Sequence, residues 1–294
     1  GDSYTSIENL SGSSFADTLV GDENDNIIDG DAGNDTLVGG YGADTLIGGT
    51  GSDTADYSTS AAGVTVNLAS NSGLGGDADG DVLSGIEHVR GTGNADVLIG
   101  DSGSNLLFGG GGDDLLRGGI GADTLNGGVG QDTVSYISST SAISINLATG
   151  ASAGGEAEGD VLIDVEAVLG SAQNDTLIGN ASTNLFDGGA GNDFLVGGAG
   201  ADTLRGDSGV DTVDYSASGS GVTVNLHTGT GIGGDSHNDQ IEGVEIVVGS
   251  DHADQLTGNA DNNELAGGDG NDTLAGGAGA DTLTGGSGID LVSY

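Results

Sequence analysis

Aspartate side chains recur along this chain at nine-residue steps, and that spacing is the first sign of a chemistry. Asp35, Asp44 and Asp53 are nine residues apart, each in the frame Gly-Gly-x-Gly-x-Asp-x-Leu-x or one close to it. The glycines permit positive φ angles and close backbone approach, so the carboxylate lies next to exposed turn carbonyls. Carboxylate and carbonyl oxygens together are the ligands that Ca²⁺ prefers. The pattern therefore predicts metal sites at turns.

A second repeat, of 79 residues, groups these nonapeptides into blocks. Two series of residues have members 79 positions apart: Glu8, Glu87, Glu166 and Glu245, and Tyr57, Tyr136, Tyr215 and Tyr294. Each block holds five nonapeptides, and its sixth-position residues are Asp, Asn, Asp, Asp and Asp in order. A disordered acidic linker has no reason to keep two registers, so the sequence indicates a repeat architecture.

The two periods predict four super-repeats. Their expected bounds are residues 1–57 (partial, with block 12–56), 58–136 (linker coils 58–90, block 91–135), 137–215 (block 170–214) and 216–294 (block 249–293). The linkers open with alternating segments that are typical of half-buried strands, at 64–68, 143–147 and 222–226. Because their 34 residues are not a multiple of nine, we expect them to form irregular coils of the same stack.

Composition excludes several classes of protein. The 294 residues include 63 Gly and 46 acidic against 3 basic residues, for a net charge of −43, with no Cys or Lys. The missing residue types exclude thiolate chemistry, Walker-type phosphate loops and Schiff bases. The charge repels nucleic acid, and no apolar run approaches the roughly 18 residues of a membrane span. We therefore expect neither nucleic-acid binding nor direct membrane insertion.

The predicted core is too thin to hold the fold by itself. Two nonapeptides make one coil of 18 residues with two inward leucines. Burying two leucines stabilises less than ordering 18 backbones costs. Stacking also brings the carboxylates into rows of like charge. A hard divalent cation removes both problems, which makes Ca²⁺ the expected cofactor.

The nonapeptides resemble those of a known family. GGYGADTLI from Gly39, GGAGNDFLV from Gly188 and GGAGADTLT from Gly276 are similar to the repeats-in-toxin (RTX) nonapeptide, and such repeats cover about 180 of the 294 residues. The resemblance implies an all-β, right-handed parallel β-roll with Ca²⁺ between turns stacked on the same side. It also implies unfolded export through a type I secretion channel and folding triggered by extracellular calcium.

Sites between nonapeptides n and n+2 would bind roughly 12 ions and reduce the net charge to about −19. The expected carboxylate ligands are Asp35, Asp44, Asp53, Asp114, Asp123, Asp132, Asp193, Asp202, Asp211, Asp272, Asp281 and Asp290. The block-leading residues Asp17, Asp96, Asp175 and Asp254 are expected ligands as well. Two questions stay open at this point. One is whether Asn26, Asn105, Asn184 and Asn263 make weaker sites, no sites, or hydrogen-bonded ladders. The other is whether the linker acids Asp77, Asp79, Asp81 and Glu87 bind further ions.

No catalytic site is expected. Gly150-Ala-Ser152-Ala-Gly154 matches the hydrolase pattern GxSxG, but that motif requires a strand-to-helix elbow, and no helix is predicted there. We expect a secreted or cell-surface structural array, such as a fibre, a surface-layer segment or an adhesin stalk, with end-to-end or lateral self-association as a further hypothesis. The alternative is a carboxy-terminal folding and export module of a secreted enzyme or toxin. Four regular units favour the array.

Overall fold

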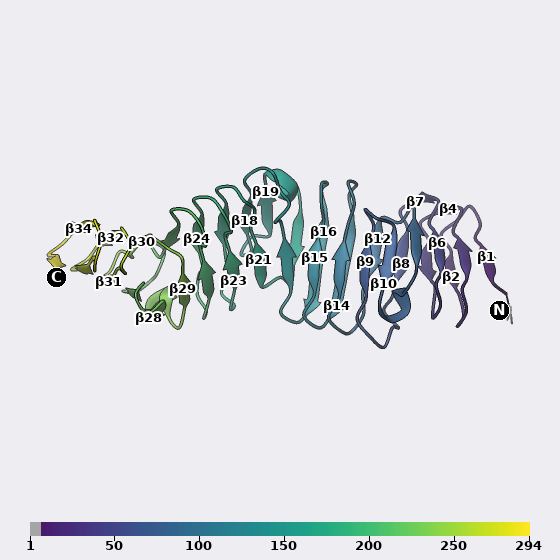
Figure 1. The fold of residues 1–294 in the computed structure, drawn as a ribbon, viewed down its shortest axis with the longest axis horizontal. Helices are drawn as coiled ribbons and strands as arrows, with labels where there is room; N and C mark the ends of the chain where they lie inside the picture. Colours follow the sequence, from purple (N-terminus) through teal and green to yellow (C-terminus); the bar gives the residue numbers. More distant parts are fainter. Residues whose placement is uncertain (1–6) are drawn as a thin grey trace. The chain divides into compact units, whose positions relative to one another are not determined.

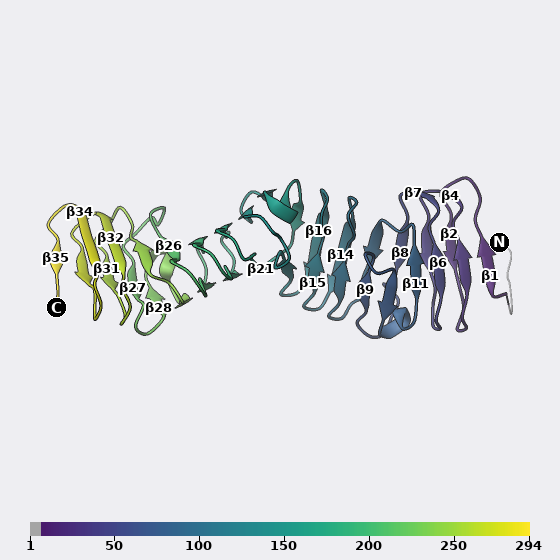
Figure 2. The same cartoon turned by 45° about the horizontal axis from the view of Figure 1, so that its top comes forward.

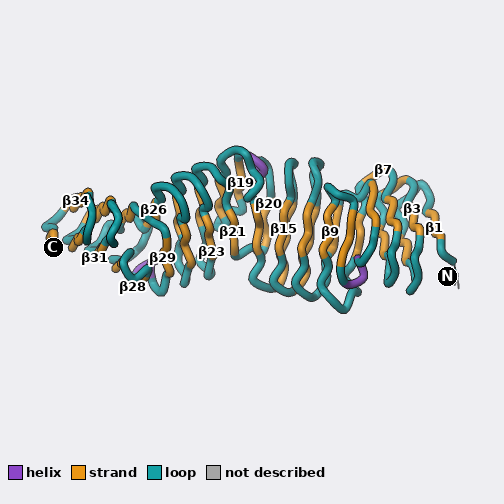
Figure 3. The backbone as a smooth tube through the Cα atoms, in the orientation of Figure 1, coloured by secondary structure: helices purple, strands orange, loops and turns teal. Residues whose placement is uncertain are grey.

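The computed structural model describes residues 7–294, and these form short β-strands and three 3₁₀ turns. Residues 1–6, where the first super-repeat is expected to begin, lie outside the described part. The chain divides into two compact units. One comprises Gly1–Ser135 with Ala157–Val165, and the other Tyr136–Glu156 with Glu166–Tyr294. Within each unit, short strands lie side by side and are joined by turns (Figures 1 and 3).

Each regular nonapeptide forms one turn and one short strand. Consecutive strands alternate between two sheets, so each strand pairs in parallel with the strand two nonapeptides away. In the first unit, Leu37 is in register with Ala55, and Ile28 with Leu46. The expected coil of 18 residues is therefore confirmed, and so is the all-β fold of a parallel β-roll.

The first unit contains two sheets, which we name after β6 and β8. In order of hydrogen-bonded neighbours, the β6 sheet contains β1 (Asn9–Ser11), β3 (Ile27–Asp29), β6 (Thr45–Ile47), β11 (Val82–Ser84), β10 (Ser72–Leu74), β9 (Thr65–Asn67), β13 (Val97–Ile99), β15 (Leu115–Arg117) and β17 (Thr133–Ser135). The β8 sheet contains β2 (Thr18–Val20), β5 (Thr36–Val38), β8 (Thr54–Asp56), β12 (His88–Arg90), β14 (Leu106–Gly111), β16 (Thr124–Val129) and β20 (Val161–Ile163). A separate parallel pair joins β4 (Ala32–Gly33) to β7 (Thr50–Gly51).

The second unit repeats this arrangement in a β25 sheet and a β26 sheet. The β25 sheet contains β21 (Ala167–Leu169), β23 (Leu185–Asp187), β25 (Thr203–Arg205), β29 (Gln240–Glu242), β28 (Thr230–Ile232), β27 (Thr223–Asn225), β31 (Gln255–Thr257), β33 (Thr273–Ala275) and β35 (Leu291–Val292). The β26 sheet contains β19 (Ala151–Ala153), β18 (Ser144–Asn146), β22 (Thr176–Ile178), β24 (Phe194–Val196), β26 (Thr212–Asp214), β30 (Ile246–Val248), β32 (Glu264–Asp269) and β34 (Thr282–Ser287). The 3₁₀ turns are η1 (Gly76–Ala78), η2 (Gly155–Ala157) and η3 (Gly234–Ser236).

The core is a single row of apolar side chains from each sheet. The central residue of each regular strand points inward, and Leu37, Leu46, Leu116 and Leu195 are fully buried. The neighbouring strand residues face outward, as the period-two pattern predicts. Tyr57, Tyr136 and Tyr215 close the blocks and are 1–3% exposed, so their rings pack into the core. The last member of the series, Tyr294, is exposed.

The linkers form ordered three-stranded meanders. The expectation that they form irregular coils of the stack was wrong. In the first unit, β9 does not pair with β6, and the chain turns back from β9 so that β10 and β11 lie between the two strands. The antiparallel strand β10 pairs with both β9 and β11, and β11 pairs in parallel with β6. In the second unit, β27, β28 and β29 repeat this path, and β27 and β28 lie next to each other in Figure 2.

The sheet that receives a meander alternates along the chain. In the second unit, β18 and β19 pair on the β26 sheet, whereas β27, β28 and β29 lie on the β25 sheet. The alternation follows from the number of elements in a super-repeat. Each super-repeat has five nonapeptide strands, one meander and one strand after the repeated Glu, which is an odd number of elements placed in turn on the two sheets. Equivalent elements of consecutive super-repeats therefore lie on opposite sheets.

Candidate metal centre

The sixth-position carboxylates form rows along the edges of the sheets, where each turn enters its strand. In these rows the Oδ1 atom of one residue accepts a hydrogen bond from the backbone N–H of the residue one coil earlier. Asp35 N–H donates to Asp53 Oδ1 at 2.8 Å, and Asp193 N–H donates to Asp211 Oδ1 at 2.8 Å. The structure thus brings the predicted ligands of nonapeptides n and n+2 together.

Most of these carboxylates keep their second oxygen buried and without a donor. The Oδ2 atoms concerned belong to Asp35, Asp44, Asp53, Asp114, Asp123, Asp193, Asp202, Asp211 and Asp272. We call such residues open carboxylates. Asp281 and Asp290 continue the rows through their Oδ1 atoms, which accept from Asn263 N–H at 3.0 Å and Asp272 N–H at 3.1 Å. A buried carboxylate oxygen without a donor is costly unless a cation neutralises it.

The open oxygens lie in a cradle that only glycine can line. A Cβ on Gly30 would be 2.5 Å from Asp35 Oδ2 and 2.6 Å from the carbonyl oxygen of Gly48. A carboxylate oxygen and a backbone carbonyl oxygen thus approach the same small space. This donor set fits a calcium ion, because Ca²⁺ takes carboxylate and carbonyl oxygens with flexible geometry.

The four block-leading aspartates differ from the open carboxylates, because a protein donor reaches the Oδ2 atom of each one. Asp96 Oδ2 accepts from Thr92 N–H at 2.6 Å, and its Oδ1 accepts from Val64 N–H at 2.7 Å. Asp17, Asp175 and Asp254 likewise accept at Oδ2 from the N–H of the residue four positions earlier. These carboxylates therefore do not need a cation.

The second residue of the nonapeptide decides whether a backbone N–H reaches the second side-chain oxygen of the aspartate. In all twelve nonapeptides of the third to fifth positions in a block this residue has a positive φ, for example Gly40 at 98° and Gly198 at 89°. Asp31 and Asp207 adopt the same conformation without being glycine, at 69° and 65°. In the first two nonapeptides of each block the residue is Ser, Thr, Asp or Asn with ordinary φ, and its N–H closes the turn onto the sixth residue. Our sequence reasoning missed this switch, although the Gly-Gly pair is readable in the sequence.

Three of the four asparagines make hydrogen-bonded links through the amide nitrogen, whereas the Asn26 Nδ2 atom is buried without an acceptor. Asn105 Oδ1 accepts from Asp101 N–H at 2.8 Å, and Asn105 Nδ2 donates to the Glu87 carbonyl at 3.0 Å. Asn184 and Asn263 make the same link to Glu166 and Glu245 at 3.4 Å. The amide supplies a donor where a carboxylate would need an ion between two oxygens.

Two of the linker acids continue the rows. Asp81 Oδ1 accepts from Asp44 N–H at 2.8 Å, and Glu87 Oε2 accepts from Asp53 N–H at 2.9 Å. Asp239 and Glu245 repeat these contacts with Asp202 and Asp211. Asp77 lies half-buried in η1, where its charge adds to the burial that raises the pKa of Asp44 and Asp81, and the exposed Asp79 follows η1.

Burial changes the acidity of the open carboxylates. Desolvation raises the pKa of Asp114 and Asp193 to about 7 and that of Asp44 and Asp202 to about 6, although the backbone N–H bond to each one opposes the shift. Neighbouring aspartates raise these pKa values further. Calcium would reverse the effect, because a bound cation favours the charged form.

Within residues 7–294, no three His, Cys, Asp or Glu side chains cluster closely enough to hold a metal ion by themselves. An ion in the rows must therefore draw part of its shell from backbone carbonyls, as the glycine-lined cradle allows.

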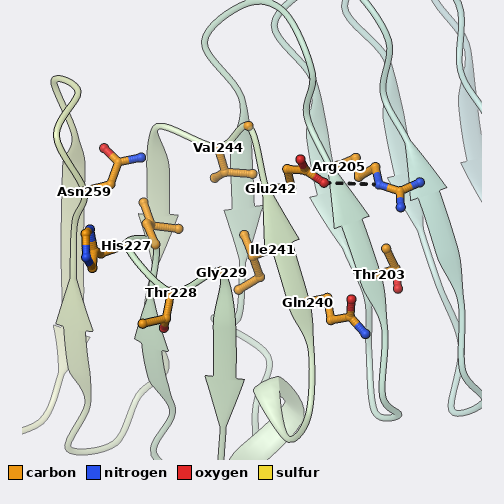
Figure 4. A pocket seen from close by; sticks show the side chains of 12 residues that line it. Thr203, Arg205, His227, Thr228, Gly229, Gln240, Ile241, Glu242, Val244 and Asn259 are labelled. Atoms are coloured by element: carbon orange, nitrogen blue, oxygen red, sulfur yellow. Dashed lines mark ion pairs between the residues drawn. The ribbon is translucent and has the colours of Figure 1, made fainter.

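One cavity lies outside the rows, beside β29. It has a volume of about 360 Å³, and the Arg205 Nε–Glu242 Oε2 ion pair of 3.5 Å forms one wall (Figure 4). Gly229 lines it, and Asn71 occupies the matching position in the first unit. There the Asn71 amide nitrogen, oriented toward the Leu68 and Leu83 carbonyls, donates to both at 3.0 Å. The cavity is thus a variation in meander packing.

The fold and these rows define a calcium-binding parallel β-roll. The RTX calcium-binding nonapeptide repeat (4 copies) matches residues 5–37, 38–56, 81–116, 99–134, 166–195, 187–217, 239–274 and 257–292. These matches cover more than half of the chain, and the chain belongs to this family. A search of curated proteins finds no match. No helix among residues 7–294 is both long and apolar enough to cross a membrane. The serine of the GxSxG match lies on β19 between Ala151 and Ala153, so the elbow that the motif requires is absent from that segment.

Proposed function

We propose that this chain is a secreted structural array whose coils fold when they bind extracellular calcium. The observation that carries the proposal is the triplet of nonapeptides with a left-handed second residue, which recurs in every block. Nine of these twelve nonapeptides hold a buried carboxylate oxygen without a donor. One ion for each of the twelve supports roughly 12 calcium ions.

The same carboxylates explain why folding would wait for secretion. Without calcium, closing each triplet means burying several like charges, so the triplets favour the unfolded state, which an export channel can accept. Extracellular calcium neutralises the rows and shifts the balance toward the folded state. The repeated design then supports an extended surface role, such as a fibre, a surface layer or an adhesin stalk.

A far-UV circular dichroism titration from calcium-free protein tests the calcium step. We expect a cooperative coil-to-β transition at roughly 0.1–1 mM Ca²⁺ and none with Mg²⁺ over the same range. A chain with full β content in chelator and no response to calcium would refute the calcium step.

Antibody labelling of intact producing cells tests the structural role. An array should remain at the cell surface in calcium-containing medium and be lost from it after chelation. Recovery of the chain only from the culture fluid, covalently joined to an enzyme or toxin, would instead support the export-module reading.

A further inference from the structure

Where a row of carboxylates enters a meander, a side-chain hydroxyl donates to the carboxylate oxygen that lacks a donor elsewhere in the row. Asp81 follows Asp44 in its row and accepts the Asp44 N–H at Oδ1, as any regular member does. Its Oδ2, however, accepts the Tyr57 hydroxyl at 2.9 Å, whereas Asp44 Oδ2 has no donor. Tyr57 and Asp81 are both 2% exposed, so this hydroxyl lies within the buried row.

The second unit contains the same arrangement. Asp202 N–H donates to Asp239 Oδ1 at 2.9 Å, and the Tyr215 hydroxyl donates to Asp239 Oδ2 at 2.8 Å. Asp202 Oδ2 has no donor. In both units, therefore, a hydroxyl satisfies the oxygen that the preceding coil leaves open.

On the far side of each meander, protein donors again satisfy the row. Val222 N–H donates to Asp254 Oδ1 at 2.7 Å, and Ser250 donates to Asp254 through both its N–H and its hydroxyl. The next coil carries Asn263, whose amide bonds the Glu245 carbonyl. In each unit, one meander segment thus lies between two triplet segments along the chain. Meander segments, residues 57–108 and 215–266, have satisfied carboxylates, and triplet segments, residues 30–56, 109–135, 188–214 and 267–293, have open ones.

We propose that the meander segments stay folded without calcium and that calcium extends the fold from them into the triplet segments. The tyrosine hydroxyl takes the place that a cation takes in the neighbouring coil, and so it ends each row of calcium sites. A hydroxyl donor suffices there because a hydrogen-bonded buried carboxylate is far less costly than an open one. This inference rests on the proposed calcium-dependent folding.

Hydrogen exchange of the full chain, read by mass spectrometry in chelator and in calcium, tests the partition. In chelator we expect the amides of β9, β11, β13, β27, β29 and β31 to exchange at least about 100-fold more slowly than those of an unfolded chain. The amides of β5, β8, β15, β17, β24 and β26 should exchange at the unfolded rate until calcium is added.

The two proposals fail differently in this experiment. Loss of protection from all strands at once in chelator, with recovery in calcium, overturns the partition and leaves the calcium-dependent folding intact. Full protection of every strand in chelator overturns the calcium-dependent folding itself.

A substitution of one atom tests the tyrosine. Tyr215→Phe keeps the ring and removes the hydroxyl, and it should raise the chelator exchange rates of β27, β29 and β31 by about tenfold or more. The control Tyr41→Phe changes a tyrosine that is 58% exposed and should leave every rate unchanged. Unchanged rates in Tyr215→Phe would overturn the role of the hydroxyl. If the variant fails to fold even in calcium, the wild-type exchange pattern still decides the partition.

Discussion

At the scale of single residues, the chemistry of the chain depends on whether one carboxylate oxygen finds a donor. Asp175 and Asp193 are both buried and both belong to the nonapeptide frame. Ser171 N–H bonds Asp175 Oδ2 at 2.6 Å, whereas the left-handed Gly189 leaves Asp193 Oδ2 without a donor. Two aspartates at the same position of the frame therefore differ in whether a protein donor satisfies the second carboxylate oxygen.

This difference predicts unequal effects of the same substitution. Asp193→Asn should lower the calcium stoichiometry by about one ion, because a neutral amide replaces a charged ligand. Isothermal titration calorimetry of the full chain measures this directly. Asp175→Asn is the matched control and should bind as many ions as the wild type. An equal loss in both variants would show that the closed turns bind calcium too.

The raised pKa values predict a pH dependence in the absence of calcium. Burial raises the pKa of Asp114 and Asp193 to about 7 in the folded chain, against the ordinary aspartate value of 3.8. Protonation of these two carboxyl groups therefore stabilises the folded state. This stabilisation is fully present below the unfolded pKa and is lost as pH rises through about 7. The β content of calcium-free protein should increase as pH falls from about 8 to about 5. A flat circular dichroism signal over that range would contradict it.

At the scale of elements, the meanders are built with side-chain contacts that the nonapeptides lack. Ser218 is buried and lies under η3. Its hydroxyl donates to the Ser220 carbonyl at 2.8 Å and accepts the Asp235 N–H at 3.0 Å. Ser60 makes the equivalent contacts with Ala62 and Asp77 in the first unit. One buried hydroxyl thus joins the start of each of these meanders to its 3₁₀ turn.

Removal of this hydroxyl should destabilise the second unit. Ser218→Ala leaves the Asp235 N–H and the Ser220 carbonyl without their partner, at a cost of about 1–3 kcal/mol. Denaturant unfolding of the calcium-loaded chain measures the change. Ser216→Ala, at an exposed serine two residues away, should be neutral. Equal stability of the two variants would mean that water replaces the hydroxyl without loss.

At the scale of the whole molecule, the nine-residue register matters more than which sheet a strand joins. Each nonapeptide strand pairs with the strand of the neighbouring coil on the same sheet, and meanders occur on either sheet of the second unit. The number of nonapeptides in a block can therefore change by one without breaking a pairing rule. The downstream strands would only exchange sheets.

Two deletions test this property. Removal of residues 188–196, one complete nonapeptide, should give a chain that still folds in calcium and binds about one ion fewer. Removal of residues 188–192 breaks the register and should abolish the cooperative transition of the downstream strands. Circular dichroism with calcium titration distinguishes the two. Failure of the nine-residue deletion to fold would show that the block length of five is itself required.

The sequence by itself determined the repeat, the β-roll and the family, because these follow from local periodicity. A nine-residue turn-strand unit leads to alternating sheets, and the inward leucines of residues 37, 46, 116 and 195 are readable from their frame. Sixteen aspartates could be named as candidates in the same way. Their binding of calcium stays a prediction.

Only the tertiary structure decided the path of the linkers and the tyrosine contacts of Asp81 and Asp239, because both depend on contacts between distant residues. The β11 strand fills a place beside β6 that the chain had passed 37 residues before, and Tyr57 meets Asp81 across 24 residues. The nine-residue repeat determines the position of each side chain in the turn or strand of its own coil. The second residue of the same nonapeptide decides whether a backbone N–H reaches the second oxygen of an aspartate, whereas a tyrosine hydroxyl reaches that oxygen only from a distant part of the chain.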